Sequence, residues 1–195
     1  MKKTEKNKPN KSYSLKDIQN FQQRSDITKL LKAGSIGVEL GVAEGRFSET
    51  LLKTGCFSHL YSIDMWAGDR HHDTAQYKTA LRRLLPFRDR NTTLRMTFDE
   101  ALDLFPDAFF DFIYVDGYAH TGEEGGATFD HWWPKLKPGG VMAGDDYAPK
   151  WPLVVQAVDA FIDKYQLEIG LLNFQKSDDP WSQYPTWATV KPIEK

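Results

Sequence analysis

The sequence predicts an α/β protein with a doubly wound, mostly parallel sheet that has helices on both faces. Two features of its pattern support this. From Ser35 onward, short apolar runs alternate with longer amphipathic segments five times, as in parallel strands that are joined by helices. After the fifth repeat, two more strand-like runs follow, joined by the polar loop 177–185 with no helix between them. We therefore expect an antiparallel pair at the edge of the sheet.

The apolar runs place seven strands, at 36–40, 59–63, 92–96, 110–115, 141–143, 168–174 and 187–190. Helices are expected in the intervals, at 47–53, at 74–85, after Thr97, from Thr121 to about 133, and from Pro152 onward. Thr97 and Thr121 each stand three residues before a glutamate, which is the spacing of a capping box. Pro152 suits the first helical position. Lys137–Gly140 predicts a turn before the fifth strand.

The chain has 195 residues, a length typical of one domain. We expect residues 1–13 to form a disordered basic tail and residues 14–195 to form a single domain. That domain begins with one or two short helices after the N-cap residue Ser14. Residues 1–16 carry six lysines and one acidic residue, although the whole chain has a net charge of −2. The folded part is therefore acidic, and a nucleic-acid partner is not expected.

The composition also excludes several classes of protein. Cys56 is the only cysteine, so there is no internal disulfide and no cysteine-based zinc site. No apolar stretch approaches the roughly 18 residues of a membrane span, and no secretory signal is recognisable. We expect a soluble, cytoplasmic protein without a membrane partner.

A glycine-rich segment follows the first predicted strand. It reads Glu39-Leu-Gly41-Val-Ala43-Glu-Gly45-Arg46. Gly41, Ala43 and Gly45 have little or no side chain, so a ligand can approach the backbone closely. An ordinary tight turn between a strand and a helix explains the same residues equally well.

Asp64 ends the second predicted strand, 23 residues beyond Gly41. In dinucleotide-binding folds, an acid about 20 residues after the glycine loop accepts the ribose hydroxyls. The two features together favour a ligand that contains adenosine. The dinucleotide motif Gly-x-Gly-x-x-Gly requires a glycine where this chain has Arg46, and this mismatch disfavours NAD.

Glu-x-Gly-x-Ala-x-Gly after the first strand, with Asp64 after the second, resembles the class I S-adenosylmethionine-dependent methyltransferases. The resemblance covers about 35–191 and implies a Rossmann-like fold of seven strands, mostly parallel with an antiparallel C-terminal strand. It implies that four residues surround the methionine part of the cofactor, namely Glu39, Gly41, Ala43 and Gly45. It further implies that Asp64 binds the ribose and that four residues lie near the adenine, namely Met65 or Trp66 and, after the third strand, Thr97 and Phe98.

Acidic residues end the next two predicted strands. Asp116 follows the fourth strand, and Asp145 and Asp146 follow the fifth. Neighbouring strand ends lie roughly 5 Å apart, and three converging carboxylates repel one another unless a cation bridges them. The three oxygen ligands suit Mg²⁺, although aspartates are also common in turns. The motifs Val-Asp116-Gly and Gly-Asp145-Asp146-Tyr resemble the macrocin O-methyltransferase-like group, which implies a divalent metal that holds a substrate hydroxyl.

His120 is the candidate general base, since the near-neutral pKa of histidine suits proton removal from a hydroxyl. It lies one residue beyond the position that the resemblance implies, and a role in capping the next helix is equally consistent with its position. Asp116 is the second candidate catalytic residue and is also a candidate cofactor-binding residue.

The sequence therefore predicts methyl transfer from S-adenosylmethionine to a hydroxyl oxygen of a small molecule, assisted by a divalent metal. Methylation of nucleic-acid amino groups is disfavoured, because Val-Asp116-Gly-Tyr stands where such enzymes commonly have Asn-Pro-Pro-Tyr. The alternatives are a non-catalytic S-adenosylmethionine-binding protein and an NAD-binding protein. The acceptor has no readable signal, and a homo-oligomer is left open.

Overall fold

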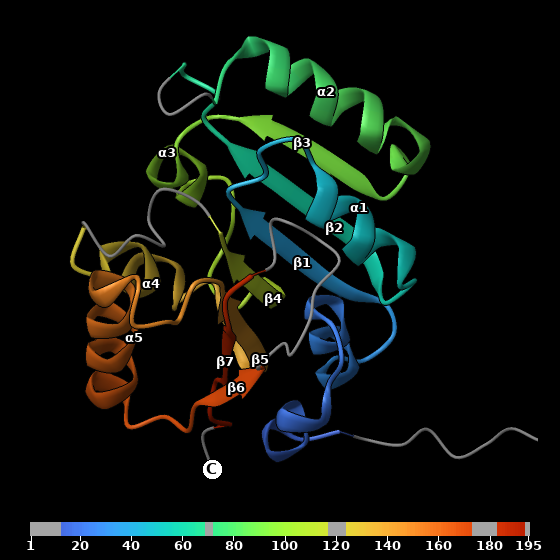
Figure 1. The fold of residues 1–195 in the computed structure, drawn as a ribbon. Coiled ribbons are helices and arrows are strands. Elements are labelled where there is room, and N and C mark those ends of the chain that lie inside the picture. The colour runs from blue at the N-terminus through green and yellow to red at the C-terminus, as the bar shows by residue number, and fades with distance from the viewer. Residues whose placement is uncertain (1–12, 69–71, 117–123, 173–182, 194–195) are drawn as a thin grey trace, which may run out of the picture.

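The computed structural model describes residues 13–68, 72–116, 124–172 and 183–193. Its centre is a seven-stranded sheet with the order β3-β2-β1-β4-β5-β7-β6 (Figure 1). The strands are β1 (Ser35–Leu40), β2 (Phe57–Asp64), β3 (Asn91–Arg95), β4 (Phe110–Val115), β5 (Leu136–Gly144), β6 (Gly170–Leu172) and β7 (Thr186–Val190).

The first five strands pair in parallel, and β7 pairs antiparallel with both β5 and β6. This confirms the predicted fold, including the antiparallel pair formed by the last two strands. The strand order reverses between β1 and β4. At such a switch point the loops that follow the two strands turn to opposite faces, and a crevice opens at their carboxyl ends.

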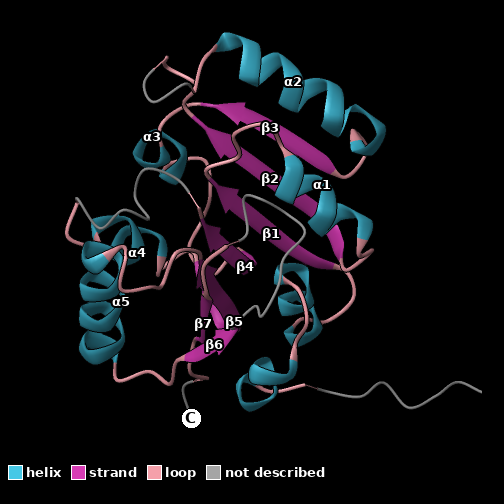
Figure 2. Cartoon of the chain, in the orientation of Figure 1, coloured by secondary structure: helices cyan, strands magenta, loops and turns pink. Residues whose placement is uncertain are grey.

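Helices cover both faces of the sheet (Figure 2). They are α1 (Arg46–Lys53), α2 (Thr74–Leu84), α3 (Phe98–Leu102), α4 (Ala127–Trp132) and α5 (Pro152–Tyr165). Within the described ranges they are accompanied by the short 3₁₀ helices η1 (Leu15–Asn20), η2 (Arg24–Leu30) and η4 (Leu85–Phe87). None of the helices in the described ranges is long and apolar enough to cross a membrane.

Two buried clusters hold the layers together. On one face, aromatic side chains of α4 and α5, among them Phe129, Trp132 and Phe161, pack against alternate residues of the central strands. On the other face, η1, η2 and α1 supply Ile18, Ile27 and other apolar residues. Figure 1 shows this division, with α4 and α5 on one side of the sheet and the N-terminal turns on the other.

The two short helices predicted after Ser14 are present, as 3₁₀ helices. Two other local predictions need correction. The turn predicted at Lys137–Gly140 lies within β5, where the pairing with β4 skips from Leu136 to Val141. Thr121, where the fourth helix was expected to begin, lies outside the described residues; within them α4 begins at Ala127, because Gly125 and Gly126 have φ angles of 62° and 81° that break a helix.

The predicted basic tail lies outside the described residues apart from Tyr13. The domain boundary at residue 14 therefore stays a proposal.

Candidate functional site

Backbone hydrogen bonds bring the carboxyl ends of four parallel strands side by side. The N–H of Gly41 donates to the carbonyl of Ile63 at 2.8 Å, and the N–H of Asp116 donates to the carbonyl of Leu40 at 2.8 Å. The N–H of Asp145 donates across the next strand pair to Val115. The residues after β1, β2, β4 and β5, which the sequence selected as site candidates, therefore share one edge of the sheet.

Three residues of the loop between β1 and α1 have left-handed backbone conformations. Gly41 has a φ of 96° and Gly45 a φ of 76°, values that side-chain-bearing residues rarely adopt. Ala43 also has a positive φ, 48°. The N–H of Gly45 donates to the carbonyl of Val42 at 2.7 Å, just before α1 begins. Gly41 and Gly45 are buried in this loop, whereas Ala43 is half-buried.

Asp64 holds this loop. Its Oδ2 accepts the backbone N–H groups of Val42 and Ala43, both at 2.9 Å, and its Oδ1 accepts the N–H of Trp66 at 3.1 Å. Burial acts to raise the pKa of Asp64, but the hydrogen bonds from His72 and from these backbone groups outweigh it and lower the pKa. Asp64 is therefore ionised at neutral pH and fixed against the glycine loop.

The two residues after Asp64 differ in their surroundings. Met65 is exposed, whereas Trp66 is fully buried. The indole N–H of Trp66 donates to the carbonyl of Ala43 at 2.9 Å, and its ring packs on Tyr77 of α2 at 4.7 Å between centroids. Trp66 thus links the glycine loop to α2.

Thr97 and Phe98 lie at the start of α3. Thr97 is the N-cap residue and forms the predicted capping box with Glu100. The N–H of Met96 donates to the carbonyl of Asp64 at 3.1 Å, which places this turn beside the end of β2. Phe98 is half-buried and packs against the core.

Glu39 faces inward. Its buried carboxyl accepts a hydrogen bond from Ser48 of α1, and Ser48 accepts one from Ser62 at 3.0 Å. The series of hydrogen bonds continues to the side-chain amide of Asn91, which donates to Ser62 at 2.9 Å. Burial raises the pKa of Glu39 to about 8, although the Ser48 hydrogen bond acts against this. Glu39 is therefore mostly protonated at neutral pH and links α1 to the sheet.

The carboxylates after β4 and β5 meet at a cation from the protein itself. Nη1 of Arg24 lies 2.9 Å from Oδ2 of Asp116 and 2.5 Å from Oδ2 of Asp145. The guanidinium also lies 3.9 Å above the centre of the Phe47 ring, a cation–π contact. We call Asp116 and Asp145 the carboxylate pair. Burial and the charge of Asp116 raise the pKa of Asp145, and Arg24 acts against both.

The geometry does not fit the metal site that the sequence predicts. Within the described part of the chain, no three Asp, Glu, His or Cys side chains are arranged to hold a metal ion. Asp146 has a left-handed φ of 61°, and its carbonyl accepts the N–H of Ala148 in a tight turn. Oδ2 of Asp116 and Oδ2 of Asp145 both already contact Nη1 of Arg24. His120, the candidate base, lies outside the described residues.

Sequence reasoning missed Arg24. It belongs to the N-terminal turns, far along the chain from both of its aspartates. One signal was available, because Arg24 stands three residues before Ile27, which is fully buried in the same 3₁₀ helix. An arginine at that spacing shares the buried side of a 3₁₀ helix and needs a buried partner.

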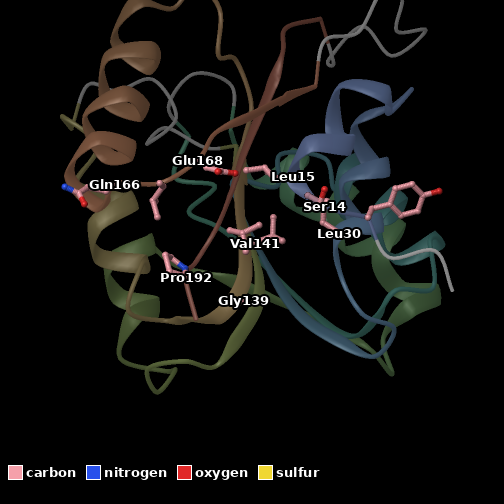
Figure 3. Close-up of a pocket in the computed structure, with 11 residues that line it drawn as sticks. Ser14, Leu15, Leu30, Gly139, Val141, Gln166, Glu168 and Pro192 are labelled. Carbon is pink, nitrogen blue, oxygen red and sulfur yellow. The ribbon is translucent and has the colours of Figure 1, made fainter. Parts of the chain in front are cut away.

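A separate pocket of about 450 Å³ lies away from this edge (Figure 3). It is lined by Ser14, Leu15 and Leu30 of the N-terminal turns and by Gly139 and Val141, which precede the carboxyl end of β5. Side chains of the site described above do not line it.

A family model described as a methyltransferase domain matches residues 36–147, more than half of the chain. The protein belongs to this methyltransferase-domain family. The matched segment runs from β1 to just beyond the end of β5 and so contains every strand end of the site.

Individual relatives are more distant. An uncharacterized protein of Sinorhizobium fredii, y4gI, is 28% identical over 114 residues, which are 57% of this chain and 12% of that protein. The chain thus spans only about an eighth of the length of this curated relative.

Solved structures show the same fold. The O-methyltransferase from Bacillus cereus, crystallised in complex with SAH, superposes with a TM-score of 0.62 at 18% identity and covers 91% of this chain and 80% of its own. The N-methyltransferase NodS from Bradyrhizobium japonicum gives 0.61 at 19% identity, covering 87% and 92%. The fold is therefore shared by enzymes named for different acceptor atoms.

Proposed function

We propose that this protein transfers the methyl group of S-adenosylmethionine to a hydroxyl oxygen of a small molecule. Its family supports methyl transfer. The observation that carries the choice of donor is that Asp64 and the glycine loop form one hydrogen-bonded unit at the ends of β1 and β2. In doubly wound sheets, ligands with a nucleoside part bind at this edge.

The residues of this edge fit an adenosyl donor. A carboxylate has roughly four acceptor positions, and three backbone N–H groups occupy three of those of Asp64. The fourth faces His72, whose Nδ1 lies 3.8 Å from Oδ2, so in this proposal a ribose hydroxyl takes the place of that contact. We assign Met65, which is exposed beside it, to the adenine together with Thr97 and Phe98.

We assign the methionine part of the donor to the backbone of the glycine loop, at Gly41, Ala43 and Gly45. Glu39 supports this loop from inside, because its carboxyl is held by Ser48. Trp66 supports it through the hydrogen bond to Ala43. The sequence placed Glu39 beside the methionine part; because the Glu39 and Trp66 side chains are both buried, this proposal has them shape the binding loop without facing the ligand.

When bound, S-adenosylmethionine supplies an electrophilic methyl group on a positively charged sulfur. The protein must hold the acceptor hydroxyl in line and remove its proton. We assign proton removal to His120 from the sequence alone, and orientation of the hydroxyl to Asp116 at the end of β4. No metal step is included, because Arg24 bridges the residues that would be the ligands.

Several finer predictions remain proposals. They are the hydroxyl acceptor, its small-molecule nature, a cytoplasmic location and a homo-oligomer. Membership of the macrocin O-methyltransferase-like, metal-dependent group also stays a prediction, and the position of Arg24 does not support its metal.

Calorimetric titration tests the donor. We expect the full-length protein to bind S-adenosylmethionine and not NAD, and Asp64→Asn to weaken that binding. Asp73→Asn is the matched control, because Asp73 caps α2 through the N–H of Gln76, and asparagine caps a helix equally well. Binding of NAD alone would contradict the proposal.

Product analysis tests the acceptor. The donor is incubated with a panel of alcohols, phenols and amines, and methylated products are identified by mass spectrometry. Methyl transfer confined to amines would replace the hydroxyl assignment, and tight donor binding without any product would favour a non-catalytic binding protein.

A further inference from the structure

We propose that Arg24 is the resident cation of the carboxylate pair, that it stands where a divalent ion would otherwise bind, and that it positions Asp116 for the acceptor. The positioning role rests on the proposed function. The replacement of a metal by Arg24 does not, since it follows from the charges and contacts of the site alone.

The guanidinium and a metal ion would compete for the same atoms. Nη1 of Arg24 contacts Oδ2 of Asp116 at 2.9 Å and Oδ2 of Asp145 at 2.5 Å. Mg²⁺ needs near-octahedral oxygen ligands at about 2.0–2.1 Å. A guanidinium at this distance from both carboxylates leaves no room for such an ion between them, and its positive charge would repel a dication.

The backbone that carries Arg24 is held on both sides. The Asp26 carboxylate accepts the N–H groups of Gln22 and Gln23, at 2.8 and 3.3 Å. Ile27 is fully buried, and Thr28 donates to the carbonyl of Ser25 at 2.8 Å. The start of η2 is therefore a fixed turn, and its arginine is directed into the site by the fold.

The side-chain contacts are equally specific. The guanidinium is sandwiched between the carboxylate pair and the Phe47 ring of α1. Only 8% of the Arg24 side chain is exposed. A buried arginine retains its charge, so it needs partners of this kind, and the carboxylates need a cation in turn.

Exposure separates the roles within the carboxylate pair. The Asp145 side chain is 3% exposed, and its Oδ1 also accepts a hydrogen bond from Thr186 at 3.2 Å. The Asp116 side chain is 24% exposed. Asp116 is thus the member that can reach an acceptor, whereas Arg24, which also contacts the more deeply buried Asp145, fixes the position of its carboxylate. Arg24 is a positioning residue in this arrangement.

A Mn²⁺ titration tests the assignment. The full-length protein is first dialysed against EDTA to remove bound metal and then, in buffer without EDTA, titrated with Mn²⁺ while electron paramagnetic resonance measures the bound ion. We expect no stoichiometric site in the wild type. Arg24→Ala should bind about one Mn²⁺ per chain, because the carboxylate pair then lacks its cation. The gained site should disappear in Arg24→Ala combined with Asp145→Asn, and Arg24→Lys should stay without metal.

Arg83→Ala is the matched control. Arg83 also lies between two acidic side chains, Glu44 and Glu49, at 4.0 and 3.1 Å, but it lies outside the edge where β4 and β5 end. Its removal should create no site. Stoichiometric Mn²⁺ binding by the wild type that Asp145→Asn abolishes would overturn the proposal, as would a folded Arg24→Ala without a gained site. If Arg24→Ala does not fold, the wild-type titration decides.

The positioning role has its own readout. Arg24→Ala should lower kcat by about 100-fold without changing the affinity for S-adenosylmethionine, and Arg24→Lys should recover part of the loss. Equal kcat in all three proteins would overturn that role. If the wild type fails to bind the donor, the proposed function fails, whereas the Mn²⁺ result still stands by itself.

Discussion

The carboxylate of Asp64 accepts the backbone N–H of Ala43 at 2.9 Å, so the end of β2 fixes the loop that leaves β1. The same carboxylate oxygen also accepts the N–H of Val42. A residue expected to bind the ribose therefore also maintains the shape of the site before any ligand is present. This double role means that its substitution should affect stability as well as binding.

Asp64→Asn should lower the free energy of unfolding at pH 7 by about 1–3 kcal/mol, because an amide cannot accept all three backbone N–H groups as an ionised carboxylate does. The pKa of Asp64 is lowered in the folded protein. Its contribution is therefore complete above the unfolded pKa of about 3.9 and is lost as pH falls through the folded value. Urea denaturation from pH 7 to pH 3 measures this, and a difference between the two proteins that does not shrink in acid would contradict it.

Glu39→Gln should have the opposite pH dependence. The folded pKa of Glu39 is about 8 and its ordinary value is 4.5. The folded protein therefore binds the extra proton between these values, and the wild type loses stability as pH rises through this range, by up to about 1.4 kcal/mol per pH unit. Glutamine still accepts from Ser48 and does not titrate. Denaturation curves at pH 5.5, 7 and 8.5 should show a flatter dependence for the variant, and parallel curves would rule out the assigned protonation.

Trp66→Phe should destabilise the protein by about 1–3 kcal/mol beyond the loss of ring volume, since it leaves the carbonyl of Ala43 without its indole donor. It should also weaken donor binding, because the glycine loop loses a support. Trp132→Phe is the control: Trp132 is fully buried, and its indole N–H has no hydrogen-bond partner within the described ranges. Thermal unfolding and calorimetry compare the two variants, and equal losses would contradict the role of the hydrogen bond.

His120→Ala should lower kcat by about 10²–10⁴-fold while donor affinity is retained, if His120 removes the acceptor proton. His131→Ala provides a comparison, because His131 is an exposed histidine that pairs with Asp99 at 3.2 Å on the surface. Rates are measured from product formation with saturating donor and the best acceptor of the panel. An unchanged kcat in His120→Ala would assign proton removal to another group.

The site was predictable where it follows strand ends. Asp64, Asp116 and Asp145 each come directly after an apolar run, and a doubly wound sheet places such residues at one edge. The charge that joins Asp116 to Asp145 was not predictable in this way. Arg24 lies in a short 3₁₀ helix, where its spacing from Ile27 indicates a buried side chain but not which residues it contacts, since its partners are far away in the sequence.

The turn wrongly predicted within β5 also depends on a partner that is far away in the sequence. Proline and two glycines at 138–140 normally mark a turn. Here Gly139 adopts a φ of 79°, but the backbone around it still pairs with Lys191 beyond β7. The residues at 138–140 do bend the backbone, as predicted. Because β5 pairs with β4 on both sides of this bend, it forms an irregularity within a strand and not a turn between two elements.

Arg24 precedes the segment that matches the family model. Under the role proposed above, the cation of the site is covalently tethered, and turnover would not follow the free magnesium concentration of the surroundings. A stretch of chain upstream of the shared core would then determine whether such an enzyme depends on dissolved ions, and exchanging that stretch would be a direct way to introduce or remove the dependence.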